Sequence, residues 1–477
     1  MEHKYRPSDL ANLSPQELII LVLRQQDLIL RLEERIKQLE TQTHKDSHNS
    51  SLPPSQFSPP HIKNLREKSN KPLGGQPGHP GHTLLMVSNP TRIIRYSVTR
   101  CEHCGRDLSG LAVSTYERRQ VFDIPALICE VTEYQAEKKR CICGHLTKAV
   151  FPKEVLAPVQ YGPNICTLVS LLANHGFLSC QRISELIQQL VGHRLNEATL
   201  CSLQNKLSAR LASFENQSKL DLIQSEVIHN DETGIPIEGK LAWLHVTSSQ
   251  KLTHYGVDLQ RGKAAMDRIG ILPNFQGFSM HDDLKAYFQY DQCRHGSCNV
   301  HHLRELTFFE EEEQAKWAGY LKELLCSAKT QVKQAREGGQ NHLDQLALQA
   351  IENQYDEIVG GALLMQSSHK GKRGKWKKTE QQTFLDRLLK YKRHILAFLY
   401  DFGIPFDNNL AERDLRMLKV KEKVSGTFRS FKGAQSFALI RGYLSTVRKN
   451  EGNIFVEVRN AFAGHSFHIP HPQAVSC

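Results

Sequence analysis

Three acidic residues of the sequence could together hold metal ions for phosphoryl transfer. Asp231 ends an alternating apolar run in VIHNDET, Asp282 ends another in FSMHDD, and Glu412 lies one turn into a helix opened by FDNNLAERDLR. Hard carboxylate oxygens are the ligands that bind divalent metals where phosphoryl groups are transferred to DNA. Each residue alone is an ordinary surface carboxylate, but adjacent strand ends crossed by a helix would bring the three to one point. We therefore predict that they hold two Mg²⁺ ions, roughly 3.5 to 4 Å apart.

Other acids compete for these roles. Glu232 and Asp283 are the direct neighbours of two of the proposed ligands. Side chains alternate across a strand, so only one member of each adjacent pair can reach the same metal ion. Asp407 and Asp414 compete with Glu412 more weakly, since Asp407 precedes the helix and would more naturally cap it. The pattern by itself leaves the choice within each pair open.

Basic residues gather next to the third acid. Between Arg413 and Lys449 there are ten lysines and arginines against two acids, a local charge of +8 in 37 residues. A second cluster, KGKRGKWKK at residues 370–378, has six basic residues in nine and suits a mobile loop that grips DNA. The two clusters predict double-stranded DNA as the partner rather than a generic solvated face. The predicted phosphate contacts are Arg413, Arg416, Lys419, Lys421, Lys423, Arg429, Lys432, Lys372, Arg373 and Lys375.

Two cysteine pairs predict a structural zinc site. Cys101 and Cys104 form a CxxC followed by glycine, the tight turn that lets two thiolates bind one zinc ion. Cys141 and Cys143 form a CxC, again followed by glycine. The four thiolates suit one tetrahedral Zn²⁺ ion. The short second spacing leaves two residues open as substitute ligands, namely His103 and His145.

A further group of cysteines and histidines has irregular spacing. It contains Cys293 and Cys298, with His295, His301 and His302 close by in the sequence. A metal site is conceivable from these residue types. The spacing favours core packing and helix capping instead.

The acids fall within a predicted α/β domain at residues 221–467. EVIHNDETGIPIEGKLAWLHVTSS contains two alternating runs joined by a turn at Glu238 to Lys240, and THYGVD is a third run. A helix at KAAMDRIG then precedes a further strand at FSMHDD. Three antiparallel strands, a helix and a further strand is the opening order of a ribonuclease H-like domain. Residues at about 301–400 are strongly helical and polar, and we interpret them as a helical insertion.

The first 40 residues contain a heptad pattern that runs from Leu13 to Glu40. β-branched residues occupy one seam position and leucines the other, with Gln25 in the remaining slot. This composition favours a parallel two-stranded coiled coil, and hence a homodimer, over a lone amphipathic helix packed on its own domain. Ser14, Pro15 and Glu17 form a capping box that begins the helix. The seam residues are Val22, Ile29 and Ile36 at position a, and Leu18, Leu32 and Leu39 at position d.

The remaining segments complete a multidomain α+β chain. Residues 41–82 are rich in Ser, Pro and Gly and read as a flexible linker. Residues 83–160 alternate β-rich runs (RIIRYSV, RRQVFDIP, ICEVTEYQAE) with the cysteine pairs, which indicates a small zinc-bound β module. Residues 161–220 are helical, with a break at Gly192 and a second helix capped by Asn196, so they resemble a DNA-binding helix-turn-helix or any helical hairpin. Residues 468–477 form a tail.

Composition limits the class of protein. With 477 residues, 40% of them hydrophobic, the chain can build two or more buried cores, and its net charge of +11 suits a polyanionic partner. No uncharged apolar run approaches the roughly 18 to 20 residues of a membrane helix. The charged start with Pro7 does not read as a secretion signal. We therefore expect a cytoplasmic protein, in which twelve cysteines are free thiols or metal ligands.

The order of these motifs resembles the transposases of insertion-sequence family 66. The resemblance runs from about residue 14 to 467. NDETG and the segment from FDNN to FRS are its most specific parts. It also includes NSSLPPS, GGQPGHPGH, the cysteine turns, RRQVFDIP, HDDLKAY, CNVHHLREL and FDNNLAERDLRMLKVKEKVSGTFRS.

The resemblance implies a DDE transposase with a ribonuclease H-like catalytic domain. Such an enzyme binds the terminal repeats of its transposon, cleaves at the ends and joins the 3′-hydroxyl ends to target DNA with two Mg²⁺ ions. Its acidic triad falls on Asp231, Asp282 and Glu412. Asp282 is preferred over Asp283 because the family's aspartate is followed by a small residue, usually glycine, so an acid at 283 is a departure. The resemblance also implies accessory proteins encoded by the same element and a bacterial, nucleoid-associated location.

Two other functions share most of these features. A decayed transposase that binds DNA without catalysis would keep everything outside the triad. The intact triad and motifs favour an enzyme over this regulator. An Mg²⁺-dependent nuclease that cuts but never joins would have the same active site, and a strand-transfer assay distinguishes it.

Overall fold

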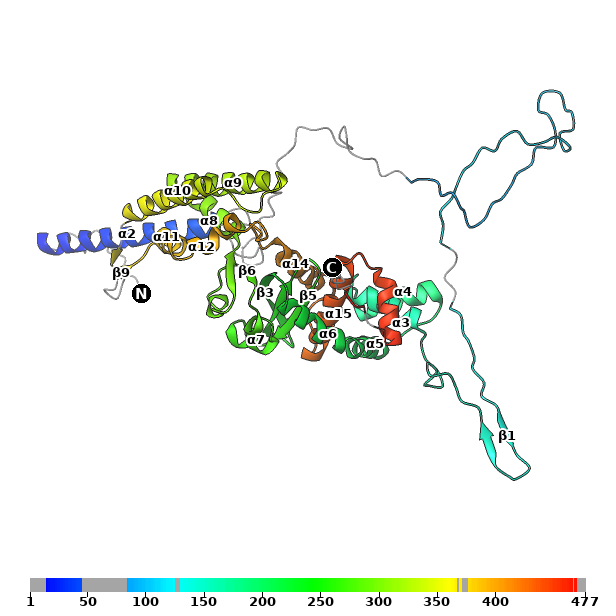
Figure 1. The fold of residues 1–477 in the computed structure, drawn as a ribbon. Coiled ribbons are helices and arrows are strands. Elements are labelled where there is room, and N and C mark those ends of the chain that lie inside the picture. Colours follow the sequence, from blue (N-terminus) through cyan, green and yellow to red (C-terminus); the bar gives the residue numbers. More distant parts are fainter. Residues whose placement is uncertain are drawn as a thin grey trace, which may run out of the picture. The chain divides into compact units, whose positions relative to one another are not determined.

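A computed structural model describes most of the chain as two compact units. The described residues are 14–44, 84–124, 129–366, 369–370, 376–465 and 467–469 (Figure 1). The predicted linker therefore lies almost wholly outside them, as does most of the tail. None of the helices within these ranges is long and apolar enough to cross a bilayer. One unit comprises Met1–Ile62, Glu133–Gln189 and His193–Cys477, and the other comprises Lys63–Thr132 and Leu190–Gly192.

A five-stranded sheet lies at the centre of the larger unit. Its strand order is β5-β4-β3-β6-β7, with β3, β4 and β5 antiparallel and β3, β6 and β7 parallel. The predicted order of three antiparallel strands, a helix and a further strand is present. The short polar strand β7 was not predicted. The bounds are β3 Val227–Ile237, β4 Lys240–Ser248, β5 Thr253–Asp258, β6 Phe278–His281 and β7 Arg294–Ser297, with α7 (Lys263–Ile269) between β5 and β6.

The prediction that Asp231 ends its strand is wrong. Strand β3 continues to Ile237 because β4 pairs with it over its whole second half, from a turn in which Glu238 and Gly239 have φ of 52° and 74°. The parallel partner β6 pairs only with Val227 to His229. Asp231 therefore lies where the parallel pairing ends, in the middle of the strand.

Helices cover both faces of the sheet. Helices α14 (Asn409–Ser425) and α15 (Phe431–Lys449) pack on one face, where Leu415 and Leu418 meet Ile235 and Leu244. On the other face, Ile228 packs with Met266 of α7 and with Tyr287 of the short helix η3 (Tyr287–Gln289). Successive residues of β3 thus point into two different cores.

A helical block separates β7 from α14, where the sequence predicted an insertion. It has its own apolar core, which includes Leu325, Tyr355 and Leu385. A two-residue strand pair lies between its third and fourth helices. Its elements are α8 Asn299–Glu311, α9 Lys316–Glu337, α10 Gln345–Leu364, β8 His369–Lys370, β9 Trp376–Lys377, α11 Glu380–Lys390, α12 Lys392–Ile395 and α13 Ala397–Tyr400.

Four helices lie between the cysteine-bearing segments and the five-stranded sheet. The predicted break is present at Gly192, whose φ is 71°, and Asn196 caps the next helix by accepting the Thr199 N–H at 2.8 Å. Helix α5 packs on α15 and on α16 (Ile454–Ala463), so it shares its core with the C-terminal helices. The four are α3 Pro163–Asn174, α4 Cys180–Val191, α5 Glu197–Arg210 and α6 Ala212–Ile223.

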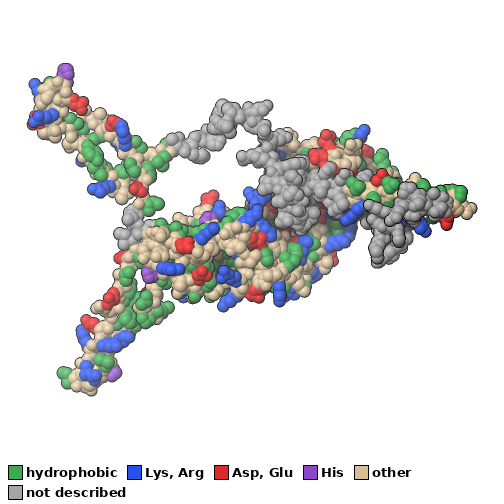
Figure 2. All heavy atoms as spheres, turned by 180° about the vertical axis from the view of Figure 1, so that it is seen from behind, with side chains coloured by type: hydrophobic (Ala, Val, Ile, Leu, Met, Phe, Trp, Pro, Cys, Tyr) green, Lys and Arg blue, Asp and Glu red, His purple; other side chains and the backbone are tan. Residues whose placement is uncertain are grey.

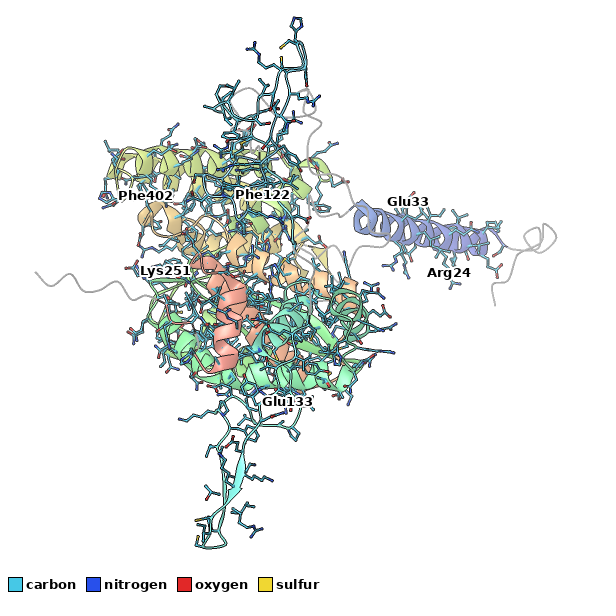
Figure 3. The ribbon with its side chains drawn as sticks, turned by 90° about the vertical axis from the view of Figure 1, so that its right-hand side faces the viewer. Arg24, Glu33, Phe122, Glu133, Lys251 and Phe402 are labelled. Carbon is cyan, nitrogen blue, oxygen red and sulfur yellow. The ribbon has the colours of Figure 1, made fainter. Side chains whose placement is uncertain are left out.

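The N-terminal helix α2 (Pro15–His44) begins as predicted. The Ser14 N–H donates to Glu17 Oε2 at 2.8 Å, and the Glu17 N–H donates back to Ser14 Oγ at 3.4 Å. Side chains project from all around this helix, including the labelled Arg24 and Glu33 (Figure 3). The seam residues Val22 and Ile29 are 59% and 55% exposed. Its apolar seam is thus open to a partner.

The cysteine-bearing segments contain less sheet than predicted. Within residues 84–124 and 129–160 the only strands are β1 (Lys138–Arg140) and β2 (Leu146–Lys148), which form an antiparallel hairpin. The runs RIIRYSV, RRQVFDIP and ICEVTEYQAE form no strand in their described parts. Hydrophobic side chains lie along the surface of these extended segments (Figure 2).

Candidate active site

The pairing register brings Asp231 and Asp282 to the same level of adjacent strands. His229 pairs with Met280 in the parallel ladder, so both aspartates lie two residues beyond the last paired couple. Neighbouring strands are about 4.8 Å apart. Asp282 directly follows β6, as the sequence predicted. The two carboxylates therefore start from adjacent positions, where the parallel pairing of β3 and β6 ends.

Helix α14 carries Glu412 to this point through the side chain of Asn408. Glu412 lies in the first turn of α14, as predicted. Asn408 precedes the helix and is 1% exposed. Its Nδ2 donates to the Asn230 carbonyl oxygen at 2.8 Å, and its Oδ1 accepts from His229 Nδ1 at 2.9 Å. The start of α14 is thus bonded to the residue that precedes Asp231.

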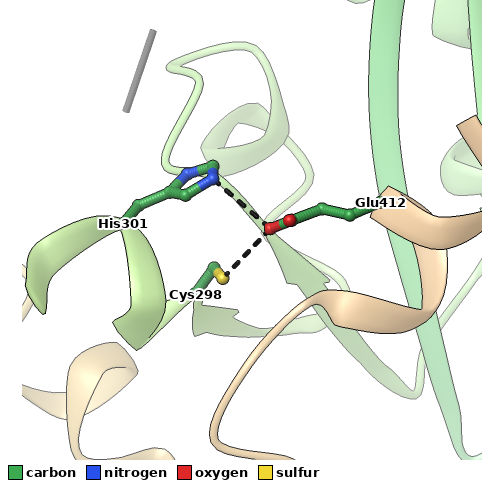
Figure 4. A group of neighbouring side chains, drawn as sticks. All are labelled: Cys298, His301 and Glu412. Atoms are coloured by element: carbon green, nitrogen blue, oxygen red, sulfur yellow. Dashed lines mark hydrogen bonds and ion pairs between the residues drawn. The ribbon is translucent and has the colours of Figure 1, made fainter. Parts of the chain in front are cut away.

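The start of α8 ties β6 to the same place. The Cys298 N–H donates to the carbonyl oxygen of His281, the residue before Asp282, at 2.9 Å. The Cys298 thiol donates to Glu412 Oε1 at 3.8 Å, and His301 Nε2 lies 3.4 Å from the same oxygen (Figure 4). Cys298 occupies the N-cap position of α8 but its side chain makes no capping hydrogen bond, so of the packing and capping expected for it only the burial is seen.

The three acids influence one another electrostatically. Burial raises the pKa of Asp231 well above its usual value, and the negative charges of Glu232, Asp282 and Glu412 raise it further. The pKa of Glu412 is lowered, chiefly by its contact with His301. Neither Asp231 nor Asp282 pairs with a lysine or arginine among the described residues, and each accepts one backbone N–H, from Glu232 and Leu284 respectively. A divalent cation would relieve this crowding of negative charge.

The neighbouring acid Glu232 is occupied by protein partners on the opposite face of β3. Asp231 lies on the odd-numbered face, which packs against α14, whereas Glu232 shares the even-numbered face with Ile228. Its side chain is completely buried. It accepts from Tyr287 Oη at 2.6 Å and from Arg261 Nε at 2.8 Å. Burial raises the pKa of Glu232 to about 7, with Asp282 contributing.

The other competing acids also have protein partners. His302 Nε2 donates to Asp283 Oδ2 at 2.8 Å, and this interaction holds the pKa of Asp283 low despite its burial. Asp414 Oδ2 pairs with Lys449 Nζ at 3.0 Å and accepts from two hydroxyl groups. Asp407 accepts the N–H of the first α14 residue at 3.2 Å, in the capping role expected for it. Among the described residues, Asp231 and Asp282 are thus the acids of this group without a cationic side-chain partner, while Glu412 contacts His301 and the Cys298 thiol.

Most of the predicted DNA contacts on α14 and after it are exposed. Lys419 is half-buried, and its Nζ donates to the Gly234 carbonyl oxygen at 2.8 Å. Lys372, Arg373 and Lys375 lie outside the described residues. The exposed members are Arg413, Arg416, Lys423, Arg429 and Lys432.

Lys421 was predicted to contact DNA, but it is buried. It is 8% exposed, donates from Nζ to the Gly426 carbonyl oxygen at 2.7 Å, and lies 3.8 Å from the centre of the Phe428 ring. Burial lowers the pKa of Lys421 to about 8. Residues three or four positions apart on a helix face the same side, and Lys421, three positions after Leu418, falls on the core side. Its ammonium group therefore serves packing rather than phosphate binding.

Each cysteine pair forms a turn of the kind that binds zinc. The Gly105 N–H donates to the Cys101 carbonyl oxygen at 2.9 Å, and the Gly144 N–H donates to the Cys141 carbonyl oxygen at 2.9 Å. Hydrogen bonds from Cys104 and Cys143 lower the pKa of the Cys101 and Cys141 thiols respectively. The first pair belongs to the smaller unit and the second to the larger. Their joint zinc site, with His103 or His145 as alternative ligands, stays a prediction.

Sequence analysis assigned Cys298 and His301 to packing and capping and did not single out Asn408, so it missed their contacts with the acids and with β3. Asn408, Cys298 and His301 act through contacts between residues over 100 positions apart in the chain, which no periodicity reveals. The spacing Cys298-x-x-His301 at the start of a predicted helix was the available signal, because it places both side chains on one turn.

Two family models match the sequence. One, described as Transposase IS66 family, matches residues 158–436, which is more than half of the chain and contains all three acids. The other, described as Family of unknown function (DUF6444), matches residues 6–84 and so contains α2. No curated protein matches the chain.

Proposed function

The chain belongs to the IS66 family of transposases, and we propose that it is a DDE transposase with a ribonuclease H-like catalytic domain. Membership of the family gives it a transposition-related function and makes DNA its partner. In our proposal it binds the terminal repeats, cleaves at the transposon ends and joins the 3′-hydroxyl ends to target DNA.

One observation carries this proposal. The triad comes from three separate elements that long-range hydrogen bonds join, while Glu232, Asp283 and Asp414 are each satisfied by cations or hydroxyl groups. Asp231 and Asp282 have no lysine or arginine partner among the described residues. Their hard carboxylate oxygens suit Mg²⁺. Two Mg²⁺ ions, when bound, would activate the attacking hydroxyl and stabilise the leaving oxygen.

The chain's own residues would orient this site. A central strand holds Asp231, which makes it the most rigid of the three ligands. Asn408 fixes the start of α14 and so the position of Glu412. The exposed basic residues of α14 and the segment after it would bind phosphates and hold the scissile bond against the acids.

Other parts of the chain would assemble the complex on DNA. The exposed seam of α2 supports a homodimer that brings two transposon ends together. The cysteine turns would bind Zn²⁺ and, with the helices of residues 161–220, contact the terminal repeats. Accessory proteins encoded by the same element would complete the machinery.

The test is a nicking assay with purified full-length chain and a plasmid that carries the element's own ends. We expect nicking in Mg²⁺ and none in EDTA. Asp231→Asn and Glu412→Gln should still bind the ends while nicking falls by more than about 100-fold, since loss of a direct ligand exceeds the cost of losing a supporting one. Asp407→Asn is the matched control and should nick normally, because asparagine can still accept the helix N–H.

The other functions give different results in the same experiment. Full nicking by Asp231→Asn or Glu412→Gln would contradict the triad. End binding without nicking in any metal would indicate the non-catalytic regulator. Nicking without joining of labelled ends to a second plasmid would indicate the nuclease.

A further inference from the structure

Three side chains of different chemistry meet beside the triad. Cys298 is the N-cap residue of α8, His301 lies in the first turn of α8, and Glu412 lies in the first turn of α14 (Figure 4). One potential ligand atom from each lies within 4.8 Å of the others. A thiol, an imidazole and a carboxylate are the three side-chain types that bind zinc in proteins.

The distances match the edges of a tetrahedral zinc site. Typical zinc bonds put a nitrogen and an oxygen ligand about 3.3 Å apart and a sulfur and an oxygen ligand about 3.6 Å apart. His301 Nε2 lies 3.4 Å from Glu412 Oε1. Cys298 Sγ lies 3.8 Å from the same oxygen. The ligand atoms are therefore close to binding distance without movement of the backbone.

The surroundings hold the two α8 ligands rigidly. Cys298 is 1% exposed, and its sulfur accepts the Asn408 N–H at 3.2 Å. Burial and the charge of Glu412 raise the pKa of the Cys298 thiol, so the thiol keeps its proton until an ion binds. The N-terminus of the 13-residue helix α8 then favours the bound thiolate, because the backbone dipoles there stabilise negative charge. His302, next to His301, is fixed by Asp283. The site is preformed on two helices rather than on loops.

We propose that Cys298, His301 and Glu412 form a binding site for a zinc-class divalent ion, and that an ion there inhibits cleavage by withdrawing Glu412 from the triad. The thiol releases its proton to solvent as the sulfur binds the ion, and water takes the fourth position. Thiolate and imidazole select borderline-soft ions over Mg²⁺, which prefers oxygen ligands. The inhibition rests on the proposed function, whereas the binding does not.

Binding is tested by titrating the full-length chain with Co²⁺ alone, without DNA. Thiolate ligation of Co²⁺ gives a near-ultraviolet charge-transfer band. The difference spectrum of the wild type minus Cys298→Ser removes the contribution of the other cysteines, which both proteins share. We expect one Co²⁺ equivalent in this difference, and a loss of affinity by more than about 100-fold in both Cys298→Ser and His301→Ala.

A matched control separates this site from the other buried thiols. Cys166 is also buried, at 4% exposed, and belongs to α3. Cys166→Ser should titrate as the wild type does. Equal spectra for the wild type and Cys298→Ser would overturn the proposal. An unchanged affinity in His301→Ala would do the same.

Inhibition is tested in the nicking assay by adding Zn²⁺ at constant Mg²⁺. Zn²⁺ should inhibit nicking by the wild type. Cys298→Ser and His301→Ala, each compared with its own rate without zinc, should need at least about tenfold more Zn²⁺ for the same inhibition. Zinc binding without inhibition would overturn the regulatory half of the proposal. Absence of nicking altogether would count against the proposed function, while the Co²⁺ result would still decide the binding site.

Discussion

Asp283 has a backbone conformation that few residues other than glycine adopt. Its φ is 63°, in the left-handed region that glycine adopts without strain and aspartate tolerates better than most residues. In this chain the side chain is bonded to His302, so the acid next to the proposed ligand serves the fold.

Removing this side chain should destabilise the protein. Asp283→Ala places a Cβ-bearing residue without local hydrogen bonding at positive φ and leaves His302, which is 2% exposed, without its partner. We expect a loss of about 3 kcal/mol, the scale for a broken buried pair, seen as a lower thermal unfolding midpoint. The exposed Asp291→Ala serves as the control and should leave the midpoint unchanged. Equal midpoints for both variants would contradict the structural role.

At the scale of elements, one side chain joins the central strand to the helix of Glu412. The side chain of Asn408 does not cap α14, because Asp407 accepts the first helical N–H. Asn408 bonds to His229 and Asn230 instead. The geometry of the triad therefore depends on a residue that bears no charge and lies outside the predicted ligand set.

Asn408→Ala should lower both stability and cleavage. It leaves buried groups on β3 unpaired, at about 1 to 3 kcal/mol for each unsatisfied group, and frees the start of α14. Nicking should fall while end binding persists. The adjacent Asn409→Ala is a matched control, because Asn409 is exposed and its side chain makes no such contact. Normal nicking by a folded Asn408→Ala would contradict the role of this residue.

The heptad seam of α2 makes a separate prediction about assembly. Val22→Ser combined with Ile29→Ser removes two apolar residues from the seam and should convert a dimer of the full-length chain into a monomer. Ile20→Ser combined with Leu30→Ser changes outer positions of the same helix and should leave the dimer intact. Sedimentation equilibrium measures both. A wild-type chain that sediments as a monomer would contradict the coiled-coil prediction.

At the scale of the whole molecule, the sequence predicted local features better than contacts between distant ones. The position of Asp282 after a strand, that of Glu412 in the first turn of a helix and the Asn196 cap agree with the structure, because each follows a local pattern of a strand end or helix start. The predicted turn at Glu238 to Lys240 is present, but Asp231 was wrongly placed at a strand end, because only the pairing with β6 stops at His229 while the pairing with β4 continues. Strand β7 was missed because RHGS is short and polar. Its partner is β6, and each paired residue of β6 lies 16 positions earlier in the sequence.

In the extended segments of residues 84–124 and 129–160, strands were predicted that do not form. RIIRYSV and RRQVFDIP have the composition of strands, yet Ile93 and Val121 are 67% and 91% exposed and no ladder forms in their described parts. β propensity reports a fit to a half-buried sheet surface, and a run without a neighbouring strand has no such surface. Composition alone could not reveal the missing partner.

The most direct test of the account replaces an oxygen ligand by sulfur. Asp282→Cys should lose nicking by more than about 100-fold in Mg²⁺, which binds thiolates poorly, and should recover much of it in Mn²⁺, which accepts softer ligands. Asp283→Cys, the adjacent residue bonded to His302, should show no such dependence on the metal. Recovery in Mn²⁺ for Asp282→Cys alone is the result that we predict. A folded, end-binding Asp282→Cys that nicks equally in both metals would contradict the metal-binding triad.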